Sequence, residues 1–326
     1  MILIVSSHDD FSTNEIIDWL LYYKHPFLRI SQDDLIEIEN IEIQNNDVEF
    51  FFQVKGKRFS NKNFPSVWYR RSWLSFAEFN IQCPKIKSVF NQSIHNQLLS
   101  EKNVIYNFVN NNLFRDSINT PFDCNINKLL VLQIAKKIGL VIPYTKIITR
   151  KKDLLALTKK YNKLITKTQT GGVFVGSSRE KLNTLTLEVS EEMIAEMPDR
   201  FFPTLFQEQI EKKIELRVFF LENQFFASAI FSQYDKQTSV DFRNYNFKHP
   251  NRTPPYMLPH DIQEKLKQLM SALHLNSGSI DLILSSGGEY VFLEVNPIGQ
   301  FKQVSKPCNY HLERLIAKRL IDKDKE

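Results

Sequence analysis

The stretch that decides the fold reads Ile280-Asp-Leu-Ile-Leu284, then Ser285-Ser-Gly-Gly288, then Glu289-Tyr-Val-Phe-Leu-Glu-Val-Asn-Pro297. Two mainly apolar runs flank a turn that contains two glycines, and this pattern predicts two antiparallel strands joined by a short loop. Both runs also carry acidic or amide side chains. A buried strand does not collect such groups on one face unless they have a partner.

The register of this hairpin decides which polar side chains meet. If residues 285–288 form the loop, Asp281 faces Phe292 and shares one face of the sheet with Glu294 and Asn296. Magnesium suits such a set, because it takes one or two carboxylates and completes its octahedron with phosphate oxygens and water. The alternative is an edge hairpin with one solvated face, which the flanking apolar residues disfavour.

Composition places the chain among globular proteins. Its 326 residues, 42% of them hydrophobic, suffice for about two domains. No stretch approaches the roughly 18 consecutive apolar residues of a membrane span, so we expect no membrane partner. Three widely spaced cysteines offer no disulfide framework and no CxxC metal pair, which favours the cytoplasm. The net charge of +5, without a dense basic tract, suits a phosphate ligand and argues against nucleic acid.

Alternating strand and helix patterns predict an α/β (α+β) protein with three parts. Residues 1–120 read as a small α/β domain. Residues 121–205 begin with a helix near residue 128 that Gly139 stops, followed by strand, helix and strand. Residues 206–326 add further strands, a helix near residues 261–273 and the polar hairpin.

The hairpin resembles the C-terminal metal hairpin of ATP-grasp ligases, which carries an Asp and then Glu-x-Asn-Pro. This resemblance covers about residues 125–320 and implies an ATP-grasp fold, in which an N-terminal, a central and a C-terminal domain hold ATP between them. Within the family the chain is most similar to the graspetide peptide maturases of the grasp-with-spasm and microviridin types. The segments that carry this similarity are Val67-Trp-Tyr-Arg-Arg71, Asn127-Lys128-Leu129, Ile142-Pro-Tyr-Thr145, Leu293-Glu-Val-Asn-Pro-Ile-Gly-Gln-Phe301 and Lys306-Pro-Cys-Asn-Tyr310.

The resemblance implies a magnesium and phosphate site. Asp281, Glu294 and Asn296 would hold Mg²⁺ between the phosphates of ATP. Lys128 and Lys167 match the two lysines that contact phosphates in the family. Each lysine could instead be an ordinary surface residue.

Two further segments match nucleotide-binding parts of the family. Gly171 and Gly172 fit the loop whose backbone N–H groups cover the phosphates, although a plain hairpin turn is equally consistent. A hinge segment would line the adenine edge and then accept hydrogen bonds from the ribose hydroxyls. Alternatively, this segment is a surface strand whose charged side chains form salt bridges. The hinge candidates are Glu208, Gln209, Ile210 and Glu211 for adenine, and Glu215 for ribose.

Four arginines are candidates for catalysis or substrate binding. Arg217 lies two residues after Glu215, so both can serve one ligand. Arg243 is a second candidate for phosphate or a substrate carboxylate. The family often has an Arg two residues before the metal Asp, and one of these two would replace it, because Ser279 stands there. Arg70 and Arg71 either face an acidic peptide or form a solvated strand end.

The implied activity is ATP- and Mg²⁺-dependent macrocyclisation of a ribosomal precursor peptide. An Asp or Glu side chain would become an acyl phosphate, and a Ser, Thr or Lys side chain of the same peptide would capture it as an ester or amide. The precursor would carry an acidic, hydroxyl-rich core and a leader that docks on the central domain, and the enzyme would be a homodimer. Two alternatives stay open: a carboxylate–amine ligase for a small molecule or protein tail, and a non-catalytic ATP-binding regulator.

Overall fold

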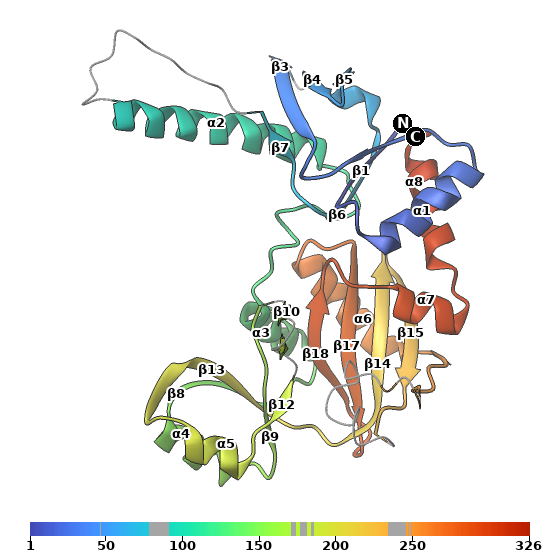
Figure 1. Cartoon of the computed structure of the whole chain (residues 1–326). Helices are drawn as coiled ribbons and strands as arrows, with labels where there is room; N and C mark the ends of the chain where they lie inside the picture. The colour runs from blue at the N-terminus through green and yellow to red at the C-terminus, as the bar shows by residue number, and fades with distance from the viewer. Residues whose placement is uncertain are drawn as a thin grey trace. The chain divides into compact units, whose positions relative to one another are not determined.

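Figure 1 shows the protein as a computed structural model with mixed α/β architecture. The structure describes the whole chain except residues 46, 78–90, 171–173, 177–180, 184–185, 234–245, 247 and 249. The chain divides into two compact units. Residues 1–125 and 311–326 form the first unit, and residues 126–310 form the second.

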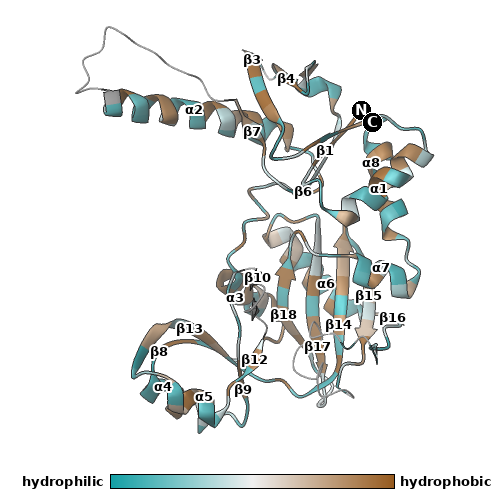
Figure 2. Cartoon of the chain, in the orientation of Figure 1, coloured by the Kyte–Doolittle hydropathy of each residue, from teal (hydrophilic) through white to brown (hydrophobic). Residues whose placement is uncertain are grey.

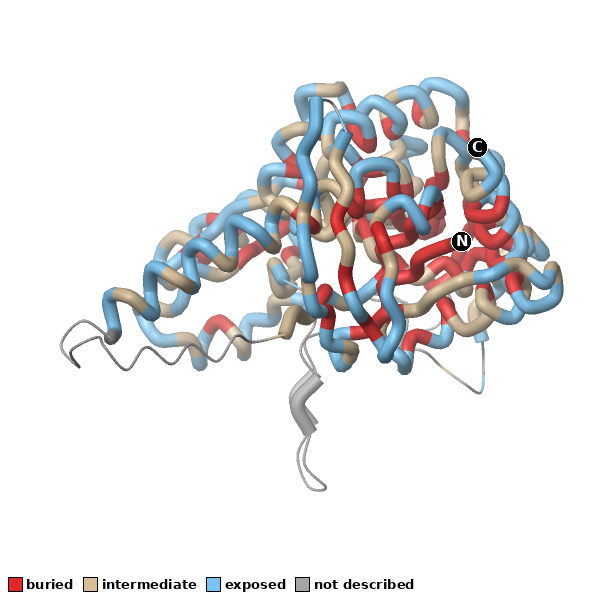
Figure 3. The backbone as a smooth tube through the Cα atoms, turned by 90° about the horizontal axis from the view of Figure 1, so that it is seen from above, coloured by how far each residue is buried: buried red, intermediate tan, exposed pale blue. Residues whose placement is uncertain are grey.

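A parallel sheet forms the core of the first unit. Its order is β2 (Phe27–Ile30), β1 (Ile2–Ser6) and β6 (Ser66–Arg71). All five residues of β1 are buried, as an apolar run in the centre of a parallel sheet requires. In Figure 3 this strand follows the marked N-terminus.

The C-terminal helix belongs to this first unit. Helix α1 (Phe11–Tyr22) starts at Asp10, whose carboxylate accepts a hydrogen bond from the Ser12 N–H. Helix α8 (Leu312–Lys323) packs against α1 and buries a stripe that includes Ile316 and Leu320. Residues 311–326 therefore pack with the first unit.

A second sheet, of four strands, and a long helix complete the first unit. Its order is β5 (Lys57–Ser60), β4 (Asp47–Val54), β3 (Leu35–Gln44) and β7 (Ser75–Phe76). The short helix η1 (Asn61–Asn63) follows β5, and α2 (Asn91–Leu113) is the long helix. No helix among the described residues is long and apolar enough to cross a bilayer.

The second unit opens with α3 (Lys128–Ile138). Asn127 caps this helix by accepting hydrogen bonds from the N–H groups of Leu129 and Leu130. Gly139 ends it with φ of 90°, a conformation that favours glycine, so the predicted stop is confirmed.

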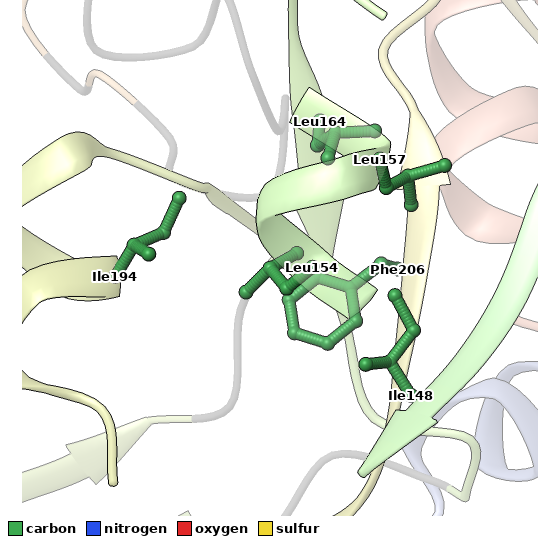
Figure 4. Packing of buried hydrophobic residues seen from close by; sticks show 6 residues of the cluster. All are labelled: Ile148, Leu154, Leu157, Leu164, Ile194 and Phe206. Atoms are coloured by element: carbon green, nitrogen blue, oxygen red, sulfur yellow. The ribbon is translucent and has the colours of Figure 1, made fainter. Parts of the chain in front are cut away.

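A four-stranded sheet with two covering helices follows α3. The strand order is β12 (Leu187–Glu188), β9 (Leu164–Thr166), β13 (Arg200–Glu208) and β8 (Thr145–Arg150). Helices α4 (Lys151–Thr158) and α5 (Glu191–Glu196) bury an apolar cluster on one face. Figure 4 shows its six residues, Ile148, Leu154, Leu157, Leu164, Ile194 and Phe206. Strands β10 (Phe174–Gly176) and β11 (Lys181–Asn183) pair separately.

A five-stranded antiparallel sheet carries the polar hairpin. Its order is β16 (Pro255–Tyr256), β15 (Gln224–Ile230), β14 (Lys212–Leu221), β17 (Ser277–Ser285) and β18 (Tyr290–Asn296). Figure 2 shows that the central strands are mainly apolar, as expected of a sheet packed on a core. Helices α6 (His260–Ala272) and α7 (Lys302–Cys308) complete the unit.

The cluster of Figure 4 gives a test of packing with a matched control. Leu154 is 0% exposed, whereas its neighbour Leu155 is 44% exposed. Leu154→Ala should lower the free energy of unfolding by about 3 kcal/mol, because it leaves a cavity. Leu155→Ala should change it by about 0.5 kcal/mol or less. Urea unfolding measures both variants, and equal losses would contradict this packing.

Candidate active site on the five-stranded sheet

The polar hairpin closes one residue later than the sequence suggested. Near the turn Leu284 pairs with Tyr290 and Leu282 pairs with Phe292. The predicted pairing of Asp281 with Phe292 is therefore wrong. Beyond that point the register shifts, and Asp281 pairs with Glu294.

This register shift is a β-bulge at Leu293, and it creates the polar face. If the register near the turn continued, Asp281 would pair with Leu293, and Glu294 and Asn296 would turn to the opposite face. The extra residue instead places Glu294 across from Asp281, and Asn296 across from Ser279. The prediction that Asp281, Glu294 and Asn296 share one face is confirmed.

Cations meet both carboxylates of this face. The Nζ of Lys128 lies 2.8 Å from Oε2 of Glu294, and Arg217 donates a hydrogen bond to Asp281. Asn296 donates to the other Glu294 oxygen, Oε1, at 3.2 Å. Burial raises the pKa of Glu294, but the charges of Lys167 and Lys128 and these hydrogen bonds outweigh it and lower the pKa to about 2. Glu294 is therefore held as a carboxylate.

Three segments that are far apart in the sequence build this arrangement. Lys128 is the first residue of α3, which packs against β18. The segment after α3 fixes this position, because Phe292 N–H donates to the Val141 carbonyl at 2.8 Å. Lys167 directly follows β9, and its charge acts on Glu294. Both predicted lysines thus act on one carboxylate; their contact with phosphate remains a prediction.

The glutamate expected at the ribose is almost completely buried. Glu215 and Arg217 pair with Ile283 and Asp281 of β17, so they share a face as predicted. The Nζ of Lys212 lies 2.5 Å from Oε1 of Glu215, and the Ser232 hydroxyl donates to the same oxygen. Burial raises the pKa of Glu215, although Lys212 and Ser232 oppose the shift.

Sequence reasoning missed Lys212 and Ser232. Lys212 sits beside Lys213 in an alternating run, but the register of β14 shifts between Lys212 and Ile214. Strand periodicity therefore could not show that Lys212 reaches Glu215. The only sequence signal was the charge pattern Glu-Lys-Lys-Ile-Glu of residues 211–215, which also suits a solvated strand.

Several backbone groups of the hinge segment, residues 208–211, already form hydrogen bonds within the protein. Glu208 exchanges hydrogen bonds with Tyr144, and its side-chain Oε1 accepts from the Tyr144 N–H at 2.7 Å. The Gln209 N–H donates to Lys163, and the Glu211 carbonyl accepts from Ser286. The N–H groups of Glu208 and Gln209 are therefore not available to an adenine edge, whereas the Glu211 carbonyl keeps a second lone pair.

Two buried polar atoms of the second unit, one on Gln209 and one on Arg217, lack partners among the described residues. They are the side-chain oxygen Oε1 of Gln209, an acceptor, and Nε of Arg217, a donor. Buried polar atoms are normally hydrogen-bonded, so such orphans are what a polar ligand would satisfy. The donor set fits magnesium in the same way, since it offers two carboxylates and one amide oxygen. Within the described ranges, no three His, Cys, Asp or Glu side chains form a metal cluster by themselves.

Ser279 is fully buried where the family often has an arginine. A Cβ on Gly299 would lie only 2.2 Å from the Cβ of Ser279, so the segment after β18 lies directly on this serine. The Ser279 hydroxyl also donates to the Gln300 carbonyl at 3.2 Å. An arginine side chain at position 279 would clash with this segment. The arginine that contacts Asp281 is instead Arg217, on the neighbouring strand β14.

The remaining predicted residues have different outcomes. Gly171, Gly172 and Arg243 lie outside the described residues.

Arg70 is 4% exposed and its Nε lies 3.1 Å from Oδ2 of Asp10, so it belongs to the core of the first unit rather than to a substrate surface. Burial lowers the pKa of Arg70 to about 10 despite Asp10. Arg71 is exposed and stays a candidate.

Comparison with known proteins identifies the family. Residues 125–321, more than half of the chain, match the RimK-like ATP-grasp domain. The chain therefore belongs to the RimK-like ATP-grasp family. No curated protein sequence matches it significantly.

Solved structures show that the fold is that of ATP-grasp ligases. A RiPP-associated ATP-grasp ligase from Chryseobacterium gregarium, in complex with ADP and a leader and core peptide, has a TM-score of 0.77 and 24% identity, covering 99% of this chain and 96% of that one. The macrocyclase MdnC from Microcystis aeruginosa, bound with precursor peptide MdnA, has a TM-score of 0.73 and 24% identity. The match covers 98% of this chain and 99% of MdnC. The ligase PsnB with minimal precursor, Mg and ADP has a TM-score of 0.69 and 16% identity, covering 99% and 97%.

The pair of Lys212 and Glu215 can be tested without any ligand. Lys212→Met should lower the free energy of unfolding by about 3 kcal/mol, because it leaves Glu215 buried without its cation. The neighbouring Lys213 is exposed, so Lys213→Met is a charge-matched control with a loss of about 0.5 kcal/mol or less. Urea unfolding at neutral pH compares them, and indistinguishable variants would show that the pair does not stabilise the fold.

Proposed function

We propose that the protein is an ATP-dependent macrocyclase that joins side chains within a ribosomally made precursor peptide. The observation that carries its ligase chemistry is the shared face of Asp281, Glu294 and Asn296, to which the cations Lys128 and Arg217 are paired. Oxygen ligands next to lysine and arginine side chains are what a magnesium nucleotide needs.

The choice of a peptide substrate rests on the extent of the structural likeness. The Chryseobacterium gregarium ligase and MdnC were both solved with a peptide bound. They align with nearly all of this chain at TM-scores of 0.77 and 0.73, whereas D-alanyl-alanine synthetase A from Vibrio cholerae covers 100% of this chain at a TM-score of only 0.53. A peptide ligase is thus favoured over a ligase for a small molecule or a protein tail.

In this proposal the residues of the second unit divide the work of holding ATP. Asp281, Glu294 and Asn296 hold Mg²⁺, while Lys128 and Lys167 take the phosphates. Glu215 accepts from the ribose, and the segment Glu208, Gln209, Ile210 and Glu211 meets the base, with the orphan Gln209 oxygen as an acceptor for the adenine amino group. Gly171 and Gly172 cover the phosphates. When bound, Mg²⁺ neutralises charge on the transferring phosphoryl group.

The reaction needs two bond exchanges, and the protein positions both. A carboxylate oxygen of an Asp or Glu side chain bonds to the γ-phosphorus as the bond to ADP breaks. A Ser or Thr hydroxyl, or a Lys amine, then bonds to the acyl carbon as inorganic phosphate leaves, and the departing phosphate takes up the proton that the nucleophile loses. Arg217, with a buried Nε donor, orients the phosphoryl oxygens, and Arg243 is the second candidate.

The proposal extends to partners, location and domains. The precursor carries a leader, which docks on the central domain, and a core rich in acidic and hydroxyl side chains; Arg71 faces the acidic part. The enzyme works as a homodimer in the cytoplasm, where the free Cys124 and Cys308 remain reduced. The functional domains are residues 1–120, 121–205 and 206–326.

Intact-mass spectrometry tests the activity directly. The peptide encoded beside this gene is incubated with the protein, ATP and Mg²⁺, and we expect a loss of one water mass per ring. Fragmentation then locates each acid and its partner. An unchanged peptide, with ATP hydrolysed only when small carboxylates and amines are added, would instead identify a small-molecule ligase. ATP binding without any turnover would identify a regulator.

The hairpin carboxylates should be required for this reaction. Asp281→Asn should slow ring formation about 100-fold or more, because it weakens the site that stabilises the transferring group. Asp33 is exposed in the first unit, so Asp33→Asn is a charge-matched control with an unchanged rate. Quenched time points analysed by mass give both rates. Normal ring formation by Asp281→Asn would refute the metal assignment.

Gln209 offers a test of base recognition. Gln209→Leu should weaken binding of a non-hydrolysable ATP analogue about 5-fold, because it removes one hydrogen bond to the base. The same analogue without its 6-amino group should bind wild type about 5-fold more weakly, but should bind Gln209→Leu no more weakly than the parent analogue. Titration calorimetry measures all four affinities, and Gln224→Leu on an exposed hairpin tip is the control. If Gln209→Leu still binds the analogue without the 6-amino group about 5-fold more weakly than the parent analogue, Gln209 does not contact the adenine amino group.

A further inference from the structure

Both carboxylates proposed to hold the metal already have cations in the structure. Lys128 pairs with Glu294 at 2.8 Å, with its side chain 25% exposed against 17% for Glu294. Arg217 pairs with Asp281, and its side chain is 10% exposed. Because these pairs are largely shielded from water, their charges are screened less than those of surface ion pairs.

The charges of this face do not favour a free metal ion. Among the described residues, the carboxylates of Asp281, Glu294 and Glu215 stand against four cations, Lys128, Lys167, Arg217 and Lys212. A divalent cation approaching the face therefore meets a net positive charge. Both oxygens of Glu294 are also occupied, Oε2 by Lys128 and Oε1 by the Asn296 amide. Each oxygen keeps a second lone pair, but a metal ion bound there would lie beside the Lys128 ammonium and be repelled by it, so metal ligation favours opening of the lysine contact.

Lys128 is the contact best able to open. Its ammonium ends a flexible four-carbon stem, and α3 holds its backbone beside β18. Arg217 is different, because it lies in the centre of β14, directly across from Asp281, and is 9% exposed. A phosphate group brought near the face would offer Lys128 a new partner and would reverse the sign of the local charge.

We propose that Lys128 is a built-in counter-ion that keeps divalent metal out of the hairpin until a nucleotide arrives and draws the lysine away from Glu294. This inference rests on the proposed function for the metal site and adds an order of binding. Metal and nucleotide then bind with strong positive coupling, which must be the same in either direction. The nucleotide delivers both the phosphate for Lys128 and the negative charge that the metal needs.

The test measures Mn²⁺ binding to the full chain without nucleotide, by the electron paramagnetic resonance signal of the free ion. Lys128→Met should bind Mn²⁺ at least about 10-fold more tightly than wild type, because Glu294 loses its competing cation. Lys318→Met removes the same charge from an exposed position on α8 and should match wild type. Lys128→Arg keeps the counter-ion and should also match wild type. Equal affinities for wild type and Lys128→Met would overturn the counter-ion role.

Repeating the titration with ADP measures the coupling. ADP should raise the Mn²⁺ affinity of wild type at least about 10-fold and should raise that of Lys128→Met much less, because the competitor is already gone. Equal increases in the two proteins would overturn the proposal.

A second variant separates this inference from the proposed function. Adding Glu294→Gln to Lys128→Met should abolish the gained Mn²⁺ binding. If the double variant binds Mn²⁺ as tightly as Lys128→Met, the metal does not use the hairpin, and the proposed metal site itself fails. If the gain is abolished but ring formation is never observed, the counter-ion role stands and the macrocyclase proposal fails.

Discussion

The bulge at Leu293 is the constraint on which the site depends, because it shifts the pairing register between β17 and β18 by one residue. Asp281 and Glu294 come opposite each other only through this insertion, and Asn296 follows on the same face. The rest of the polar face is a response to that placement. Two carboxylates side by side in a half-buried sheet repel each other and need cations, and Lys128, Lys167 and Arg217 supply them.

The cations come from three different elements, and this ties the second unit together around its polar face. Lys128 enters on α3, Lys167 follows β9 and Arg217 lies on β14. Each element is fixed by ordinary packing or pairing: α3 by β18, β9 by β13, and β14 by β17. Helix packing and strand pairing thus place these charges beside the two carboxylates.

Buried ion pairs have a different role in the first unit. Arg70 and Asp10 lie in the core beside the parallel sheet, where Asp10 also caps α1. Within this pairing Arg70 is 4% exposed, whereas its neighbour Arg71 is exposed. The register of β6 shifts at this point, and the dipeptide that looked like a single basic patch divides into a buried and an exposed residue.

The sequence by itself determined the fold class and the composition of the polar face of the hairpin. Apolar runs, the Gly139 stop and the Asp, Glu and Asn of the hairpin are local signals, because alternation and chain reversal depend on neighbouring residues. Only the tertiary structure decided the bulge at Leu293, the contact of Lys212 with Glu215, the burial of Arg70 and the docking of α8 on α1. These depend on packing between distant segments, whose energies no local pattern contains.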